Sequence, residues 1–250
     1  MVARRAVFAA ALAAGFAALP VTGAAPAAPR PVVWVQAGHE SPGEPGYRAQ
    51  TGAAGEAAFN RRIAASVERR LRAAGVDARH TPGRVTPLRA GGAVFVSIHY
   101  DTPGGHSTVG HAITGAGENW YRGEGTGQAR STPYPDSAPH RSPTTVSAGV
   151  ERNSARLAGI LAARYGAVFT RANGARSGPV RLEPRAGNRR VMRYYGYYRT
   201  RATARVLIEA GAGGIDAAIL SRTELVARAI AGGIVDYLHS RGQLSVPTAG

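Results

Sequence analysis

The stretch AVFVSIHYD, residues 93–101, has the pattern of a buried strand that ends in a chemically active side chain. Residues 94–98 are mostly apolar, as in strands buried in a parallel sheet, and the run stops at His99. Taken alone, His99 is most simply a core histidine whose ring nitrogens are hydrogen-bonded. A functional interpretation requires other chemically active residues at the same edge of the sheet.

Two further apolar runs end in the same way. Residues 32–35, VVWV, lead to His39, and residues 206–208, VLI, lead directly to Glu209. Because an isolated carboxylate is costly to bury, Glu209 must be paired, coordinated or at the sheet edge. In open α/β sheets, ligands bind beyond the carboxyl ends of the strands. We therefore expect His39, His99 and Glu209 to converge there.

Helical patterns separate these strands. Residues 55–75, GEAAFNRRIAASVERRLRAAG, form an amphipathic pattern with apolar residues every four positions and a glycine at the end. A second helix is predicted over residues 150–165, before Gly166. A third is predicted from a capping box at residues 221–224 through Leu238.

The alternation of strands and helices predicts an α/β protein. With a further strand at residues 76–81, we expect a single domain built on a mainly parallel, twisted sheet flanked by helices. A chain of 250 residues leaves little room for a second domain. Residues 102–147, rich in Gly, Pro, Ser and Thr, are expected to be a long loop insertion, which in a compact domain is usually functional or disordered.

The first residues have the pattern of a secretory signal peptide. Two arginines precede an apolar stretch, residues 6–19, that is too short to cross a bilayer comfortably, and Ala-Pro-Ala at residues 25–27 fits a cleavage site. A retained N-terminal anchor is the alternative. We expect the mature protein to be secreted, to the periplasm or the cell wall, without stable membrane insertion. The predicted boundaries are a signal peptide over residues 1–27, a linker over 28–31, a catalytic domain over 32–240 and a C-terminal tail over 241–250.

The charge is strongly one-sided, with 31 basic against 15 acidic residues and a formal net charge of +16. A positive field of this size favours anionic polymers, which for an exported protein are those of the cell wall. No nucleic-acid-binding motif is present, so we expect no nucleic-acid partner. The chain has no cysteine, which excludes disulfides and leaves histidines and carboxylates as metal ligands.

Glu56 lies in the first turn of the predicted helix 55–75 and joins the same sheet edge if the preceding loop folds back over it. Two imidazoles and a carboxylate, with water in the fourth position, form the usual open catalytic zinc site. A further carboxylate nearby can take a proton from the water and pass it to the leaving group. The pattern therefore predicts a hydrolytic zinc site.

Other zinc patterns fail. Residues 41–43, Ser-Pro-Gly, follow His39 and Glu40, which excludes an H-E-x-x-H helix. The remaining histidines are expected to be surface or structural residues: His80, His106, His111, His140 and His239.

Five segments together resemble, in order, the motifs of a known family. They are VVWVQAGHE (32–40), GEAAFNRRIAASVERRLRAAGVDARHT (55–81), VFVSIHYD (94–101), ARVLIEAG (204–211) and IAGGIVDYL (230–238). The resemblance is to zinc-dependent N-acetylmuramoyl-L-alanine amidases of the amidase-3 type, which hydrolyse peptidoglycan. It implies a zinc-exopeptidase-like architecture, Zn²⁺ bound by His39, Glu56 and His99, and Glu209 as catalytic acid/base.

The chain departs from the family pattern at several positions. Gln36 and Ala37 replace Asp-Pro, a site that supplies an outer partner to a ligating histidine. Glu40 follows His39 where the family has Gly, which makes it a rival to Glu56 for the metal. The insertion at residues 102–147 is unusually long and is interpreted as a cleft wall, a lid or an unstructured segment.

The function that the resemblance implies is hydrolysis of the amide between N-acetylmuramic acid and L-alanine. The expected partners are peptidoglycan as substrate and an activator protein, and the chain is expected to be a monomer. Two alternatives stay open, an exported zinc metallopeptidase of related fold and a non-catalytic, Arg-rich wall-binding protein. The Tyr/Arg run at residues 193–201 is interpreted either as a sugar-stacking surface or as the edge of a sheet.

Overall fold

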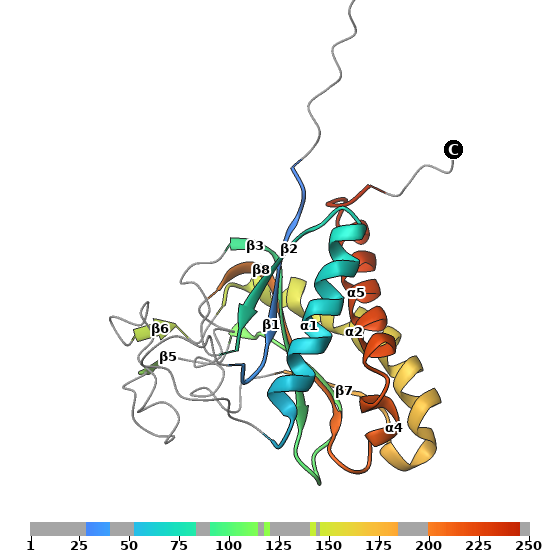
Figure 1. Ribbon diagram of the computed structural model, residues 1–250. Coiled ribbons are helices and arrows are strands. Elements are labelled where there is room, and N and C mark those ends of the chain that lie inside the picture. Colours follow the sequence, from blue (N-terminus) through green and yellow to red (C-terminus); the bar gives the residue numbers. More distant parts are fainter. Residues whose placement is uncertain are drawn as a thin grey trace, which may run out of the picture.

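A six-stranded sheet forms the centre of the computed structural model (Figure 1). The structure describes residues 29–40, 53–83, 91–114, 118–120, 141–143, 146–184 and 200–245. The strand order is β2 (Asp77–Pro82), β1 (Val32–Ala37), β3 (Gly91–Asp101), β8 (Arg201–Ala212), β4 (Thr108–His111) and β7 (Arg181–Pro184). Strands β2, β1, β3 and β8 are parallel, whereas β4 runs antiparallel to β8. The prediction of a mainly parallel sheet is confirmed.

The long insertion at residues 102–147 contains strands that its composition does not indicate. Strand β4 joins the main sheet, and β5 (Glu118–Trp120) pairs with β6 (Arg141–Pro143) in a separate two-stranded sheet. Residues 121–140, which include His140, lie outside the described residues, as do the predicted signal peptide and most of the Tyr/Arg run.

Three long helices pack against one face of the main sheet: α1 (Glu56–Ala73), α2 (Ala148–Asn173) and α5 (Thr223–Ser240). In Figure 1 they stand together on one side of the strands, with β5 and β6 on the other. The short helix α4 (Ala217–Leu220) precedes α5, and the 3₁₀ helix η3 (Gly174–Ser177) follows α2. Within the described part of the chain, none of the helices is apolar over enough residues to cross a membrane.

Helix α2 continues past the predicted end at Tyr165. Leu161, Tyr165 and Phe169 recur every four residues and are all fully buried, so the apolar face of the helix extends through Gly166. The helix ends instead at Asn173, where Gly174 has a left-handed φ of 70°. The predicted stop at Gly166 was wrong because the buried face outweighs the helix-weakening effect of one glycine.

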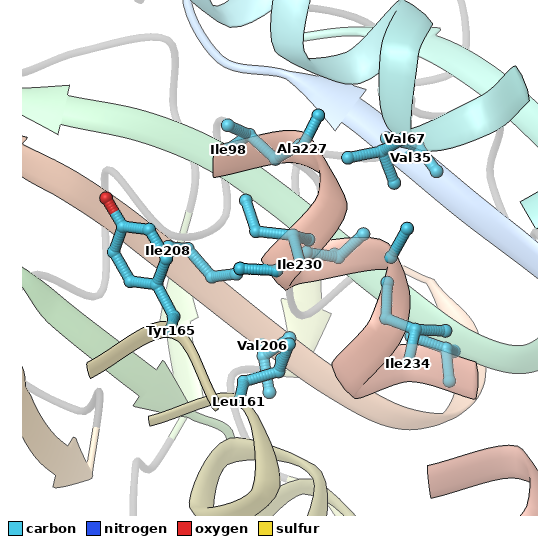
Figure 2. Packing of buried hydrophobic residues seen from close by; sticks show 14 of the residues in the cluster. Val35, Val67, Ile98, Leu161, Tyr165, Val206, Ile208, Ala227, Ile230 and Ile234 are labelled. Atoms are coloured by element: carbon cyan, nitrogen blue, oxygen red, sulfur yellow. The ribbon is translucent and has the colours of Figure 1, made fainter. Parts of the chain in front are cut away.

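The main core lies between these helices and one face of the sheet. Val35, Ile98 and Val206 point from three neighbouring strands toward Ile230 of α5 and Leu161 of α2 (Figure 2). All five side chains are fully buried. Since successive residues of a strand point to opposite faces, their polar neighbours lie on the other face of the sheet.

Helix α5 does not begin with the predicted capping box. The helix starts at Thr223, and the N-cap residue that precedes it, Arg222, makes no side-chain capping hydrogen bond. Glu224, the expected reciprocal partner, instead accepts hydrogen bonds from Ser66 and Arg70 of α1, both at 2.8 Å. The sequence pattern was misread because its acid joins two helices that are far apart in the chain.

The second face of the sheet carries a smaller apolar cluster and then polar residues. Phe95 and Leu207 pack with Ala112, and Trp34 and Ile113 lie against them. Further along the same strands this face carries Gln36, Ser97, His99 and Glu209, toward the carboxyl ends. The fold therefore brings polar side chains of β1, β3 and β8 to one edge.

Candidate metal centre

His39, Glu56 and His99 form a compact cluster at the carboxyl edge of the sheet. One ligand atom from each residue lies within 4.8 Å of the others. Glu56 Oε1 is 3.5 Å from His39 Nε2 and 3.2 Å from His99 Nδ1. The two imidazole rings meet edge to face, with centroids 5.0 Å apart. The structure thus brings together the three residues that the resemblance assigned to zinc.

His39 is delivered by a tight turn after β1. The Gly38 N–H donates to Ile98 O at 2.9 Å, and Gly38 O accepts from Asn60 Nδ2 at 2.9 Å. A Cβ on Gly38 would stand only 2.2 Å from His99 Cε1, so only glycine allows the second imidazole to lie against this turn. His39 itself adopts a left-handed backbone with φ of 59°.

Glu56 reaches the cluster from the first turn of α1. Its Oε2 accepts the Ala53 N–H at 2.8 Å, which leaves Oε1 directed at the two histidines. Burial raises the pKa of Glu56, but the hydrogen bond with His99, the charges of His99 and His39 and the Ala53 N–H together hold it below its ordinary value. The helix N-terminus also favours a negative charge here. Glu56 is therefore held as a carboxylate.

His99 is oriented by a chain of hydrogen bonds along the second face of the sheet. Ser97 Oγ donates to Gln36 Oε1 at 2.7 Å and lies 3.0 Å from His99 Nε2. Since the hydroxyl has only one proton, it accepts from the Nε2–H of His99. His99 Nδ1 lies 3.2 Å from Glu56 Oε1, a separation that a proton on Nδ1 bridges as a hydrogen bond and that a metal ion bound to both atoms can take over. The donor set and its orientation fit a zinc ion.

Glu209 lies beside this cluster and not within it. It is the register partner of His99 on the parallel strand β3 and of Thr108 on the antiparallel strand β4. Register partners on neighbouring strands are about 5 Å apart and point to the same face. Ser107 Oγ fixes the Glu209 backbone carbonyl at 2.8 Å. Glu209 is thus a second, half-buried carboxylate next to His99, separate from the candidate ligands.

Glu40 is not a rival ligand. Its Oε1 pairs with Arg61 Nε at 2.9 Å and its Oε2 with His80 Nε2 at 2.7 Å, so both oxygens are engaged away from the cluster. The other described histidines are also elsewhere. His106 Nε2 lies 3.2 Å from Arg181 Nη1, and His239 Nδ1 donates to Leu244 O at 2.8 Å.

Three polar residues of the site were not predicted: Gln36, Ser97 and Asn60. Each had a usable signal. Ser97 precedes His99 by two residues and so shares its face of the strand, and Asn60 follows Glu56 by four residues and so shares its face of the helix. Gln36 was noted only as a departure from the family pattern, yet it anchors the chain that orients His99.

Comparison with known proteins identifies solved structures that have a similar fold. No protein-family model matches the chain, and no match was found among curated proteins. Among solved structures, the N-acetylmuramyl-L-alanine amidase Ami1 from Mycobacterium smegmatis is similar at 16% identity and a TM-score of 0.50, over 84% of this chain and 97% of that one. The CwlD amidase from Clostridioides difficile, in complex with the GerS lipoprotein, is similar at 15% identity and a TM-score of 0.50, over 84% and 100%.

These likenesses extend over nearly the whole length of both solved proteins. The chain therefore has the fold of the N-acetylmuramoyl-L-alanine amidases. The predicted fold class, and the resemblance to the amidase-3 type at the level of fold, are confirmed.

Proposed function

We propose that this chain is a zinc-dependent N-acetylmuramoyl-L-alanine amidase that acts on peptidoglycan. The amidase fold supports the proposal, but one observation carries it. Three candidate metal ligands lie within 4.8 Å of one another, and a separate carboxylate, Glu209, is in register with one of them. A metal-dependent hydrolase needs a metal centre and an adjacent proton carrier, and these residues are suited to both tasks.

The metal would be held by His39, Glu56 and His99, which leaves one coordination position open. A zinc ion there supplies Lewis acidity, which polarises the substrate carbonyl and makes water acidic enough to ionise near neutral pH. The Ser97 hydroxyl and Gln36 hold the His99 ring in the tautomer whose Nδ1 faces the centre. The Ala53 N–H holds the Glu56 carboxylate, and the Asn60 side chain holds the turn at Gly38.

Glu209 is the proposed catalytic acid/base. Its carboxylate takes a proton from the attacking water as the oxygen–carbon bond forms, and it returns that proton to the amide nitrogen as the carbon–nitrogen bond breaks. The products are a lactyl carboxylate on the muramic acid and the free amine of L-alanine. Without this proton transfer the amine leaves poorly, so the loss of Glu209 should reduce turnover by about 10² to 10⁴.

Export is part of the proposal because peptidoglycan lies outside the cytoplasm. We take residues 1–27 as a removable signal peptide, and the mass of the protein recovered from culture medium or periplasm tests this boundary. The CwlD amidase was solved with the GerS lipoprotein bound. A regulatory partner is proposed for this chain as well, and the chain itself is proposed to be monomeric.

The experiment is mass spectrometry of purified peptidoglycan after digestion by the zinc-loaded mature protein, with Glu209→Gln as control. Stem peptides that begin with free L-alanine, together with glycan strands that lack peptides, are expected from the wild type and not from the control. Cleavage between other residues would indicate a metallopeptidase. The digestion is repeated with zinc confirmed bound, once alone and once with cell extracts that contain partner proteins. Peptidoglycan that stays intact in both cases would contradict hydrolysis and favour a wall-binding protein.

A further inference from the structure

A chain of alternating charges lies behind the turn that carries His39. Arg61 Nε contacts Glu40 Oε1 at 2.9 Å, and Glu40 Oε2 contacts His80 Nε2 at 2.7 Å. His80 Nδ1 contacts Glu68 Oε1 at 2.8 Å, and Glu68 Oε2 contacts Arg72 Nη2 at 2.8 Å. These five side chains are here called the Glu40 cluster: Arg61, Glu40, His80, Glu68 and Arg72. The cluster joins α1 and β2 to Glu40, the residue directly after His39.

The acids of the Glu40 cluster are largely withdrawn from water. The side chains of Glu40 and Glu68 are only 12% and 7% exposed. Hydrogen bonds to Glu40 and Glu68 raise the pKa of His80 to about 9, so both of its ring N–H groups donate at neutral pH. A buried carboxylate that loses its partner pays a large desolvation penalty. Glu40 is thus fixed in place through His80.

His39 needs such a restraint because its backbone is unfavourable. Among the residues that the structure describes, it is the one non-glycine with a positive φ, at 59°. This conformation is disfavoured for a non-glycine residue, and it persists only where the surroundings enforce it.

The end of β2 packs directly against the same turn. A Cβ on Gly83 would lie 2.4 Å from His39 N and 2.6 Å from Ala37 O. Strand β2 and the residue after it therefore touch the His39 turn twice, through the His80 side chain on Glu40 and through the backbone at Gly83.

We propose that His80 is a positioning residue for the metal centre: by holding Glu40 together with Arg61, it keeps His39 in its left-handed conformation and so raises the affinity for zinc. This inference rests on the proposed metal site. It assigns a role to Glu40, which stands where the resembled family has glycine, and to a histidine that binds no metal.

The test measures zinc affinity by competition with a chromophoric chelator, and measures melting of the metal-free protein in parallel. Removing an outer partner of a metal ligand typically weakens metal binding 10- to 100-fold, so His80→Gln is expected to weaken zinc binding by about tenfold. His239→Gln is the matched control, since His239 Nδ1 donates to Leu244 O at the C-terminal end of α5, and this variant should bind zinc as tightly as the wild type.

A double-variant cycle separates positioning from general destabilisation. If His80 acts through Glu40, then Glu40→Gln should weaken zinc binding similarly, and the double variant should be no weaker than the weaker single variant. Where His80→Gln melts too low to assay, Arg61→Gln removes the other Glu40 partner from an exposed side of α1 and should lower the affinity in the same direction.

Each possible zinc affinity supports or overturns the positioning role of His80. Wild-type zinc affinity in His80→Gln, or in both Arg61→Gln and Glu40→Gln, overturns the inference and leaves the proposed function standing. Additive effects in the double variant also overturn it. A wild-type chain that binds no zinc overturns the proposed function and this inference together.

Discussion

Gly38 is the residue on which the two candidate histidine ligands depend. Its missing side chain leaves room for the His99 ring, which would otherwise lie 2.2–2.5 Å from a Cβ. Its two backbone groups are meanwhile bound to Ile98 and Asn60. The turn is therefore held in place, so a side chain at position 38 would displace the His99 ring instead.

We expect Gly38→Ala to weaken zinc binding by more than about tenfold, because the displaced ring can no longer share the site with His39 and Glu56. The measurement is zinc affinity by chelator competition. Gly91→Ala is the control, since a Cβ on Gly91 would meet nothing within 4 Å. Equal affinities in the two variants would show that the close packing at Gly38 has no role in the site.

At the scale of secondary-structure elements, α1 has two tasks. Its N-terminus presents Glu56 to the candidate metal centre, and its later turns carry Glu68 and Arg72 of the Glu40 cluster. Because β2 joins this cluster through His80, the position of an edge strand is tied to a titratable group.

Stability should therefore depend on pH through His80. Its pKa in the folded protein, about 9, is above its ordinary value of 6.5. A raised pKa means that the protonated form stabilises the fold, an effect that is complete below pH 6.5 and is lost as the pH rises through about 9. We expect the unfolding free energy of the metal-free wild type to fall across this interval more steeply than that of His80→Gln. Urea titrations at several pH values check this, and equal slopes would contradict it.

Helix α5 packs against both of the other long helices. Ile230, on its buried face, lies among strand and helix residues and is fully buried (Figure 2). Ile230→Ala should lower the unfolding free energy by about 2–5 kcal/mol, because it removes buried methylene groups and leaves a cavity. Chemical denaturation measures this, with Arg228→Ala on the exposed side of α5 as the control, expected to change stability by less than about 0.5 kcal/mol. A similar loss in both would argue against the packing that Figure 2 shows.

The elements that sequence patterns predicted are those with many apolar residues at a regular spacing. Strands β1, β3 and β8 were visible because each apolar run stops at the sheet edge, which also indicated His39, His99 and Glu209. Strands β4 and β7 were not, since each has four residues and draws its stability from neighbours. The partner of Glu224, like that of Ser97, depends on contacts between segments far apart in sequence, which periodicity does not report.

At the scale of the whole molecule, the net charge follows directly from the sequence, without any knowledge of the fold. A formal net charge of +16 creates a long-range attraction to anionic polymers, but it identifies no particular binding surface. Because the Debye length shortens from about 10 Å at 0.1 M salt to about 3 Å at 1 M, such an attraction is sensitive to salt.

We expect Glu209→Gln to bind purified cell walls at low salt and to be released progressively as sodium chloride is raised. Sedimentation with insoluble wall material measures this, and Glu209→Gln is chosen because the proposed loss of hydrolysis would keep the wall material intact. Binding that does not change with salt would mean that contacts other than charge retain the protein on the wall.

Strand β8 connects the two parts of the main sheet. It is the last strand among the described residues, yet it lies between β3 and β4, which precede it by about a hundred residues. Without β8 the main sheet would consist of two separate pieces, β2-β1-β3 and β4-β7, and Glu209 would have no partners in register. Pairings over such sequence separations form slowly. A chain that ends before β8 would carry His39, Glu56 and His99 without Glu209, so the proposed hydrolysis requires a chain that is folded through its last described strand.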